Sequence, residues 1–156
     1  MTGAIDRFTA AAAELGITPD IRRFPQGTKT AQDAANALGC DVAQIVKSLV
    51  FMADDAAVIA YTSGANRVDP VKLAELAEAS EARRATPEEA RAATGFAVGG
   101  TPPFGHPARL RSWIDPDLLA FQEIWAAAGT PDSVFPLRPD ELVRTTRAVP
   151  RDFTED

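Results

Sequence analysis

The 156-residue sequence contains one cysteine, one histidine and no long apolar run. Because Cys40 is alone, an internal disulfide and a multi-cysteine zinc site are excluded, and the single His106 argues against a mixed His/Cys metal site. A site made only of carboxylates stays open, although we expect neither a metal nor a cofactor. No stretch approaches the roughly 20 apolar residues that span a bilayer, and the N-terminus lacks a signal-peptide core. These absences predict a cytoplasmic protein with no membrane partner.

The chain does contain enough apolar residues for one core. Hydrophobic residues make up 46% of it, and no repeat or low-complexity linker divides it, so residues 1–156 are predicted to form one domain. Caps and periodicity predict helices at 3–15 and 30–39 and helix starts at Asp69, Thr86 and Pro139, with strands at 21–24, 45–53, 57–61, 109–114, 121–125 and 133–137. In the helix after Asp69, Val71, Leu73, Leu76 and Ala77 are expected to face inward. This irregular alternation, with one hairpin, favours an α+β fold with a mixed sheet.

Lys47 interrupts an apolar, strand-like run. Side chains alternate along a strand, and the neighbours of Lys47 on both faces are mostly apolar, which predicts a central strand. An ammonium group in such a place needs an anion, a cleft or a lowered pKa, because a buried unpaired charge is costly. The alternative is that the stem of Lys47 lies along apolar surface and its charge reaches water at the strand edge. The pattern by itself leaves both open.

A second unusual segment lies between Thr94 and His106, where four glycines and two prolines interrupt a short apolar run. Such a backbone is bare and tightly turned, so its N–H groups can face an anion or a polarised carbonyl. The segment matches no phosphate-loop or dinucleotide fingerprint, and the alternative is an ordinary turn. If the loop is functional, a branched side chain at Gly100 is expected to remove its function with little loss of fold.

Together the two segments resemble the YbaK / prolyl-tRNA-synthetase-associated editing domain family. The parts of this resemblance that are specific to the family are the strand lysine, Lys47, and the loop from Gly99 to Gly105. Supporting matches are Gly27-Thr28-Lys29-Thr30, Leu38-Gly39, Gly64, Arg67-Val68-Asp69 and Ala92 to Phe96. Many members have serine where Thr101 or Pro102 stands, so the hydroxyl chemistry of the loop is not carried over. The resemblance implies a curved, partly barrel-like mixed sheet flanked by helices.

The resemblance also implies a free-standing hydrolase that deacylates mischarged aminoacyl-tRNA, with a pocket for the amino acid and the terminal adenosine. Lys47 would contact a phosphate or carbonyl oxygen, and the amides of Gly99, Gly100 and Thr101 would face the ester. The implied substrate-binding residues are Phe24, Thr28, Lys29, Ser48, Pro102, Phe104, Gly105, His106 and Asp115. No Ser-His-Asp or Cys-His assembly is evident, so a positioned water is expected. The alternatives are a non-catalytic module that binds aminoacyl-tRNA or a synthetase, and a hydrolase of small esters.

Three of these positions have open alternatives. His106 is a candidate general base because its ordinary pKa lies near neutrality, or it is simply an exposed residue. Asp115 either orients a substrate amine or caps the turn before Pro116. Thr28 and Lys29 precede a helix N-terminus, where a phosphate could bind, or they form a solvated loop.

The net charge of −6 argues against a broad basic footprint for nucleic acid, but it allows contact with one end of a tRNA. The basic residues gather in sequence as Arg83, Arg84 and Arg91, as Arg109 and Arg111, and as Arg138, Arg144, Arg147 and Arg151. Each cluster is either solvated surface or a contact for phosphate. The expected partners are the 3′ end of an aminoacyl-tRNA and an aminoacyl-tRNA synthetase, and the expected assembly is a monomer or a homodimer.

Overall fold

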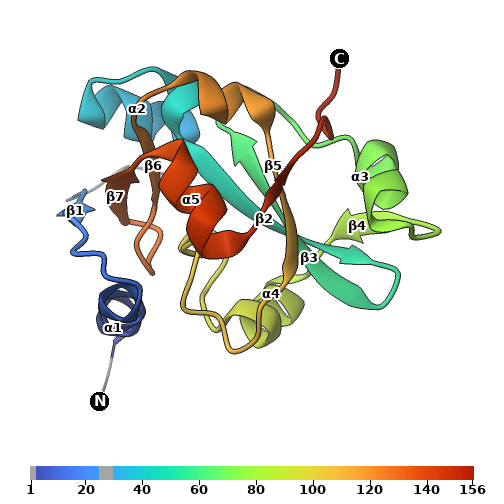
Figure 1. The fold of residues 1–156 in the computed structure, drawn as a ribbon, viewed down its shortest axis with the longest axis horizontal. Coiled ribbons are helices and arrows are strands. Elements are labelled where there is room, and N and C mark those ends of the chain that lie inside the picture. The colour runs from blue at the N-terminus through green and yellow to red at the C-terminus, as the bar shows by residue number, and fades with distance from the viewer. Residues whose placement is uncertain (1–2, 25–29) are drawn as a thin grey trace.

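The computed structural model describes residues 3–24 and 30–156. Along the chain the elements are α1 (Ala4–Glu14), β1 (Arg22–Arg23), α2 (Ala31–Leu38), η1 (Val42–Gln44), β2 (Val46–Ala53), β3 (Ala56–Ser63), α3 (Pro70–Ala77), β4 (Ala82–Arg84), α4 (Pro87–Thr94), β5 (Arg111–Ile114), η2 (Pro116–Ala120), β6 (Ile124–Ala127), β7 (Ser133–Leu137), α5 (Pro139–Thr146) and β8 (Val149–Pro150). The strands form a five-stranded sheet, β4-β2-β3-β5-β8, and a three-stranded sheet, β1-β7-β6 (Figure 1).

The five-stranded sheet is mixed. β2 and β3 form the predicted antiparallel hairpin, with Val46 opposite Ser63, whereas β5 runs parallel to β3. β2 lies between β4 and β3, so the prediction of an interior strand is confirmed, although β4 pairs only with Phe51 to Ala53 and does not reach Lys47. The two sheets meet at a bridge between Ile45 and Trp125. The α+β class is therefore confirmed, while the described strands stay open and do not close into a barrel.

The helices begin where their capping residues predict. Thr30 accepts a hydrogen bond from the Asp33 amide at the start of α2, and Asp69 accepts one from the Val71 amide at the start of α3. Thr86 and Glu89 form a reciprocal capping box on α4. No helix in the described ranges is long and apolar enough to cross a membrane.

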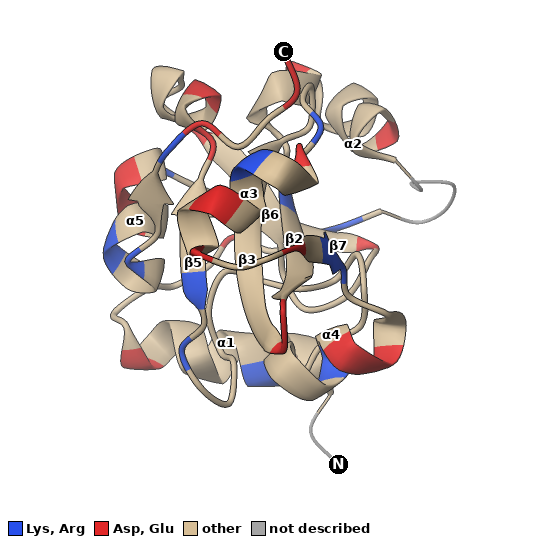
Figure 2. Cartoon of the chain, turned by 90° about the vertical axis from the view of Figure 1, so that its right-hand side faces the viewer, with Lys and Arg blue, Asp and Glu red and all other residues tan. Residues whose placement is uncertain are grey.

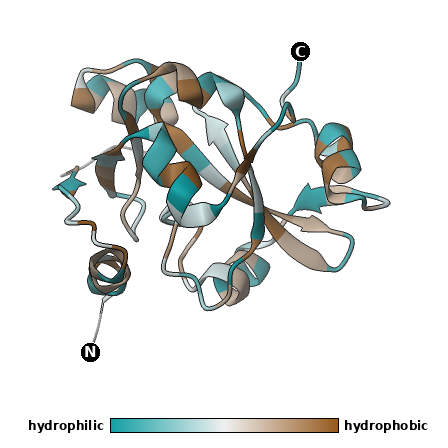
Figure 3. Cartoon of the chain, viewed as in Figure 1, coloured by the Kyte–Doolittle hydropathy of each residue, from teal (hydrophilic) through white to brown (hydrophobic). Residues whose placement is uncertain are grey.

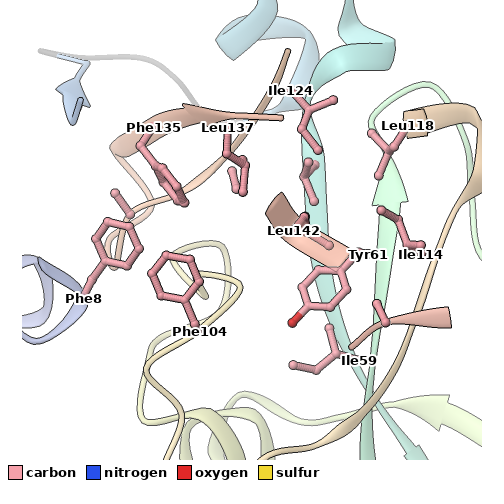
Figure 4. Packing of buried hydrophobic residues seen from close by; sticks show 14 of the residues in the cluster. Phe8, Ile59, Tyr61, Phe104, Ile114, Leu118, Ile124, Phe135, Leu137 and Leu142 are labelled. Carbon is pink, nitrogen blue, oxygen red and sulfur yellow. The ribbon is translucent and has the colours of Figure 1, made fainter. Parts of the chain in front are cut away.

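The main core lies between the large sheet, α1 and the small sheet. Figure 4 shows Phe8 from α1 facing Phe104 from the glycine-rich loop, with Phe135 of β7 beside them. The rings of Phe8 and Phe104 stack with their centroids 5.2 Å apart. The N-terminal helix thus packs against the loop through these two rings.

The structure corrects several sequence expectations. Val71 is 67% exposed, whereas Leu73, Ala74 and Ala77 of α3 are buried and Leu76 packs partly against the same core. The strand expected at 121–125 begins only at Ile124, since η2 occupies the preceding residues. β4 was not predicted, because two of its three residues are arginines. Figure 3 shows β4 as a hydrophilic edge strand beside the apolar hairpin.

Candidate functional site

A cavity of about 650 Å³ opens where the two sheets separate. β6 meets β2 at the Ile45–Trp125 bridge, and the hairpin end of β2 is covered by β4, so the cavity lies between these two contacts. Of the residues predicted from the sequence, those that line it are Phe24, Lys47, Ser48, Gly99 and Thr101. The strand lysine and the glycine-rich loop, far apart in the sequence, therefore share one cavity.

The other predicted residues are placed differently. Those that do not line the cavity are Gly100, Pro102, Phe104, Gly105, His106 and Asp115. Thr28 and Lys29 lie outside the described residues. In the part of the chain that the structure describes, no group of three or more His, Cys, Asp or Glu residues could hold a metal ion.

Lys47 is half-buried, and its ammonium group donates a hydrogen bond to the backbone carbonyl of Asn66. Burial lowers the pKa of Lys47, and the positive charges of Arg67 and Arg84 lower it further. The negative charge of Asp115 opposes this shift. Lys47 is thus neither a free surface group nor part of an ion pair with the described residues. The Asn66 carbonyl and the nearby Asp115 carboxylate stabilise its half-buried charge.

Asp115 positions this lysine through Asn66. The Asn66 side-chain amide donates to Asp115 at 2.8 Å and to Asp117 at 2.7 Å. Asp115 is 1% exposed, and it also accepts from the Ser63 amide at 3.1 Å. Its carboxylate is therefore used inside the protein, where it also caps η2 by accepting from the Asp117 amide at 3.0 Å, as the capping alternative predicted. Sequence reasoning missed Asn66, which lies in the turn after β3.

Gly99 and Thr101 of the glycine-rich loop line the cavity. In the described residues, the N–H groups of Gly99 and Thr101 have no hydrogen-bond acceptor. The N–H of Gly100 instead donates to the Ala97 carbonyl at 3.0 Å. A Cβ on Gly100 would lie only 2.7 Å from the Thr130 Cα. Gly100 is therefore part of the turn itself, which corrects the expectation that all three amides face the ester.

Two side chains hold the loop by its proline carbonyls. The Tyr61 hydroxyl donates to the Pro103 carbonyl at 3.1 Å, and Nε2 of His106 lies 2.8 Å from the Pro102 carbonyl. Because a carbonyl only accepts, Nε2 of His106 must carry the proton. Burial lowers the pKa of His106, so the ring is neutral at neutral pH. His106 consequently supports the loop and is not placed as a free base.

Among the clustered arginines predicted from the sequence, Arg84 lines the cavity. It lies over the Phe51 ring, 5.7 Å from the centroid, and it forms no ion pair with the described residues. Its neighbour Arg83 is instead bound to Glu89 by two hydrogen bonds of 2.8 Å each. Figure 2 shows both signs of charge on α1, α4 and α5, so the helices form no continuous basic face.

Comparisons with known proteins agree on one family. A model of the aminoacyl-tRNA editing domain matches residues 25–145. The chain is 30% identical over 124 residues to the uncharacterized protein YwhH of Bacillus subtilis, covering 79% of this chain and 78% of that protein. It is 40% identical over 95 residues to a proline–tRNA ligase of Solidesulfovibrio magneticus, covering 60% of this chain but 15% of the ligase. A solved structure described as a candidate trans-editing enzyme for prolyl tRNA synthetase superposes with a TM-score of 0.93 at 41% identity, covering 100% and 99% of the two chains.

Proposed function

The chain belongs to the aminoacyl-tRNA editing domain family, and on that premise we propose that it deacylates mischarged aminoacyl-tRNA by hydrolysing the ester with a positioned water. The membership confirms the resemblance inferred from the lysine strand and the glycine-rich loop. One observation carries the proposal: Lys47 lines the same cavity as Gly99 and Thr101, whose amides have no acceptor in the described residues. A cation and two N–H donors at one site suit a reaction that builds negative charge on oxygen.

The Gly99 and Thr101 amides would stabilise the tetrahedral intermediate. Attack on the ester carbonyl moves negative charge onto its oxygen, and each fixed donor aimed at that oxygen is worth about 2.7–4 kcal/mol in the transition state. Lys47 would hold a phosphate or the carbonyl oxygen of the substrate. Its ammonium group is already held by the Asn66 carbonyl, so little reorganisation is needed when the substrate binds.

The attacking water would be activated by the substrate itself. None of the described residues that line the cavity is Asp, Glu, His or Cys. The hydroxyls of Ser48, Thr101 and Ser133 also line the cavity, but within these residues no carboxylate or imidazole is present to activate them or a water. An aminoacyl-tRNA, by contrast, carries both a ribose hydroxyl and an α-amine beside the ester. The role of the protein is then to position the water and the ester, with the terminal adenosine held in the rest of the cavity.

A panel of charged tRNAs tests this function. The likeness to proline–tRNA ligase and to the candidate trans-editing enzyme makes mischarged tRNA for proline the first substrate to test, with alanyl, seryl, cysteinyl and threonyl esters. We expect loss of the ester from several of them, because a pocket discriminates one methylene by only about 1–3 kcal/mol. Binding without hydrolysis would support the alternative, a non-catalytic module of the same fold. Equal turnover of free aminoacyl esters would indicate a small-ester hydrolase.

A further inference from the structure

The edge of β2 that faces the cavity has no strand partner around Ser48 in the described residues. β3 pairs with β2 over its whole length, but on the opposite edge β4 pairs only with Phe51 to Ala53. The last bond on that edge runs from the Ala85 amide to the Val50 carbonyl at 3.0 Å, after which the chain turns into the cap of α4. At the other end of the gap, β6 meets β2 at Ile45.

The backbone of Ser48 points into this gap. The Ile45 carbonyl accepts from the Gly64 amide at 2.7 Å, which directs the backbone groups of Ile45, and of every second residue after it, toward β3. The Val50 carbonyl points to the opposite edge, so the N–H and C=O of Ser48 point there too, because these directions alternate along an antiparallel strand. In the described part of the chain neither group has a hydrogen-bond partner. Ser48 also lines the cavity.

We propose that the Ser48 backbone reads the α-ammonium group of the aminoacyl substrate. The Ser48 carbonyl accepts from the ammonium, and the Ser48 N–H donates to the acyl carbonyl. Because the amine is then protonated, the ribose hydroxyl is the substrate group that remains to activate the water. An α-aminoacyl group presents a donor and an acceptor as a strand residue does, so it completes the open edge as a hydrogen-bonded antiparallel pair. The proposal rests on the proposed function for its substrate class, and it goes further by requiring a free α-amine.

The neighbouring residues explain why an acylated amine is excluded. Acylation removes the charge, and hydrogen bonds to charged groups are stronger than neutral ones. The acyl group would also extend along the edge toward Val50, where Ala85 already pairs. Peptidyl and formylaminoacyl esters would therefore be rejected, while esters of free amino acids are accepted.

The same placement brings the substrate side chain beside that of Ser48. Directly opposed residues of an antiparallel pair project their side chains from the same face. The Ser48 hydroxyl is buried and has no hydrogen-bond partner in the described residues. A hydroxyl on the substrate would satisfy it, so a seryl group is expected to bind several-fold more tightly than an alanyl group.

Non-hydrolysable analogues test recognition of the α-amine by Ser48 separately from hydrolysis. We would titrate the full chain with adenosines that carry an alanyl, propionyl, N-acetylalanyl or seryl group in amide linkage at the 3′ position. Relative to the alanyl compound, we expect the propionyl and N-acetylalanyl compounds to bind at least about tenfold more weakly, as for loss of a bond to a charged group. Binding of all these compounds within twofold, or no measurable binding of the alanyl compound, would overturn the proposal.

Ser48→Ala separates the backbone from the side chain. This variant keeps the N–H and C=O but removes an unpartnered hydroxyl, so the fold is expected to be retained. We expect it to keep the preference for a free amine and to lose the preference for seryl over alanyl. Loss of the amine preference in Ser48→Ala would show that the hydroxyl reads the amine, which contradicts the proposal. If the analogues are discriminated but no charged tRNA is hydrolysed, the proposed catalysis fails and the reading of the amine stands.

Discussion

The lysine side and the loop side of the cavity are held by different kinds of contact. On the lysine side, polar bonds run from the buried Asp115 through Asn66 to the Lys47 ammonium. On the loop side, ring packing of Phe104 and a close backbone approach at Gly100 set the shape. Substitutions that change charge on the lysine side should therefore lower activity without lowering the stability of the fold. Substitutions that change side-chain volume on the loop side should lower activity and stability together.

Replacing Lys47 should break the lysine side most severely. We expect Lys47→Met to lower the deacylation rate by about a hundredfold or more, as loss of a transition-state donor does. The free energy of unfolding should stay equal or rise, because a costly half-buried charge is removed. Lys47→Arg should also be impaired, since a planar guanidinium cannot take the place of a compact ammonium. Deacylation assays with urea unfolding measure both effects.

Lys72→Met is the matched control for the lysine substitution. Lys72 binds Asp152 and Asp156 near the C-terminus and does not line the cavity. It should deacylate at the wild-type rate. A Lys47→Met protein that folds and also works at that rate would remove Lys47 from the proposed site.

Alanine substitutions at Gly100 and Gly99 compare the stability of two neighbouring positions on the loop side. We expect Gly100→Ala to lower the free energy of unfolding by about 1–3 kcal/mol, because its Cβ would collide with the Thr130 backbone. This replaces the expectation that a side chain at Gly100 would spare the fold. At Gly99 a Cβ would meet only Pro131, at 3.6 Å, so Gly99→Ala should cost about 1 kcal/mol from its positive φ. Equal stability of Gly100→Ala and the wild type would contradict the close approach.

Asn66→Ala should weaken the lysine side without removing the charge. The loss of its two side-chain bonds to Asp115 and Asp117 frees the carbonyl that holds Lys47, so we expect about a tenfold lower deacylation rate, on the scale of one hydrogen bond to a charged group. Since it acts through Lys47, the double variant with Lys47→Met should be no slower than Lys47→Met alone. Additive losses in this double-mutant cycle would show that Asn66 acts independently.

The smallest expected effect is a pH dependence of the free energy of unfolding, caused by His106 on the loop side. Burial lowers the pKa of His106 below its ordinary value of 6.5, so the unfolded chain binds more protons there than the folded one. The free energy of unfolding should therefore decrease as the pH falls below about 6.5 and increase as the pH rises toward that value. The slope should be less than about 1.4 kcal/mol per pH unit. Urea unfolding at pH 5.5, 6.5 and 7.5 measures the slope. His106→Gln, whose amide can also donate to the Pro102 carbonyl, should flatten it, and an unchanged slope would assign it to other groups.

Much of the fold and part of the site could be predicted from the sequence. The starts of α2, α3 and α4 are encoded by a cap and its partner within three residues, and the β2–β3 hairpin by two apolar runs around Asp54-Asp55. The interior position of β2 in its sheet followed from the apolar neighbours of Lys47 on both faces. These features are local, so a short window of residues contains the physical cause.

Tertiary structure alone decided what these residues do. That Asn66 holds Lys47, that the Gly100 amide is used within its turn, and that Val71 faces outward depend on which segments lie against one another. The open edge at Ser48 exists only because β4 is short and β6 diverges from β2. Hydrogen bonds and packing between distant segments are set by how the whole chain folds, so the residue types at these positions could be read in advance but their partners could not.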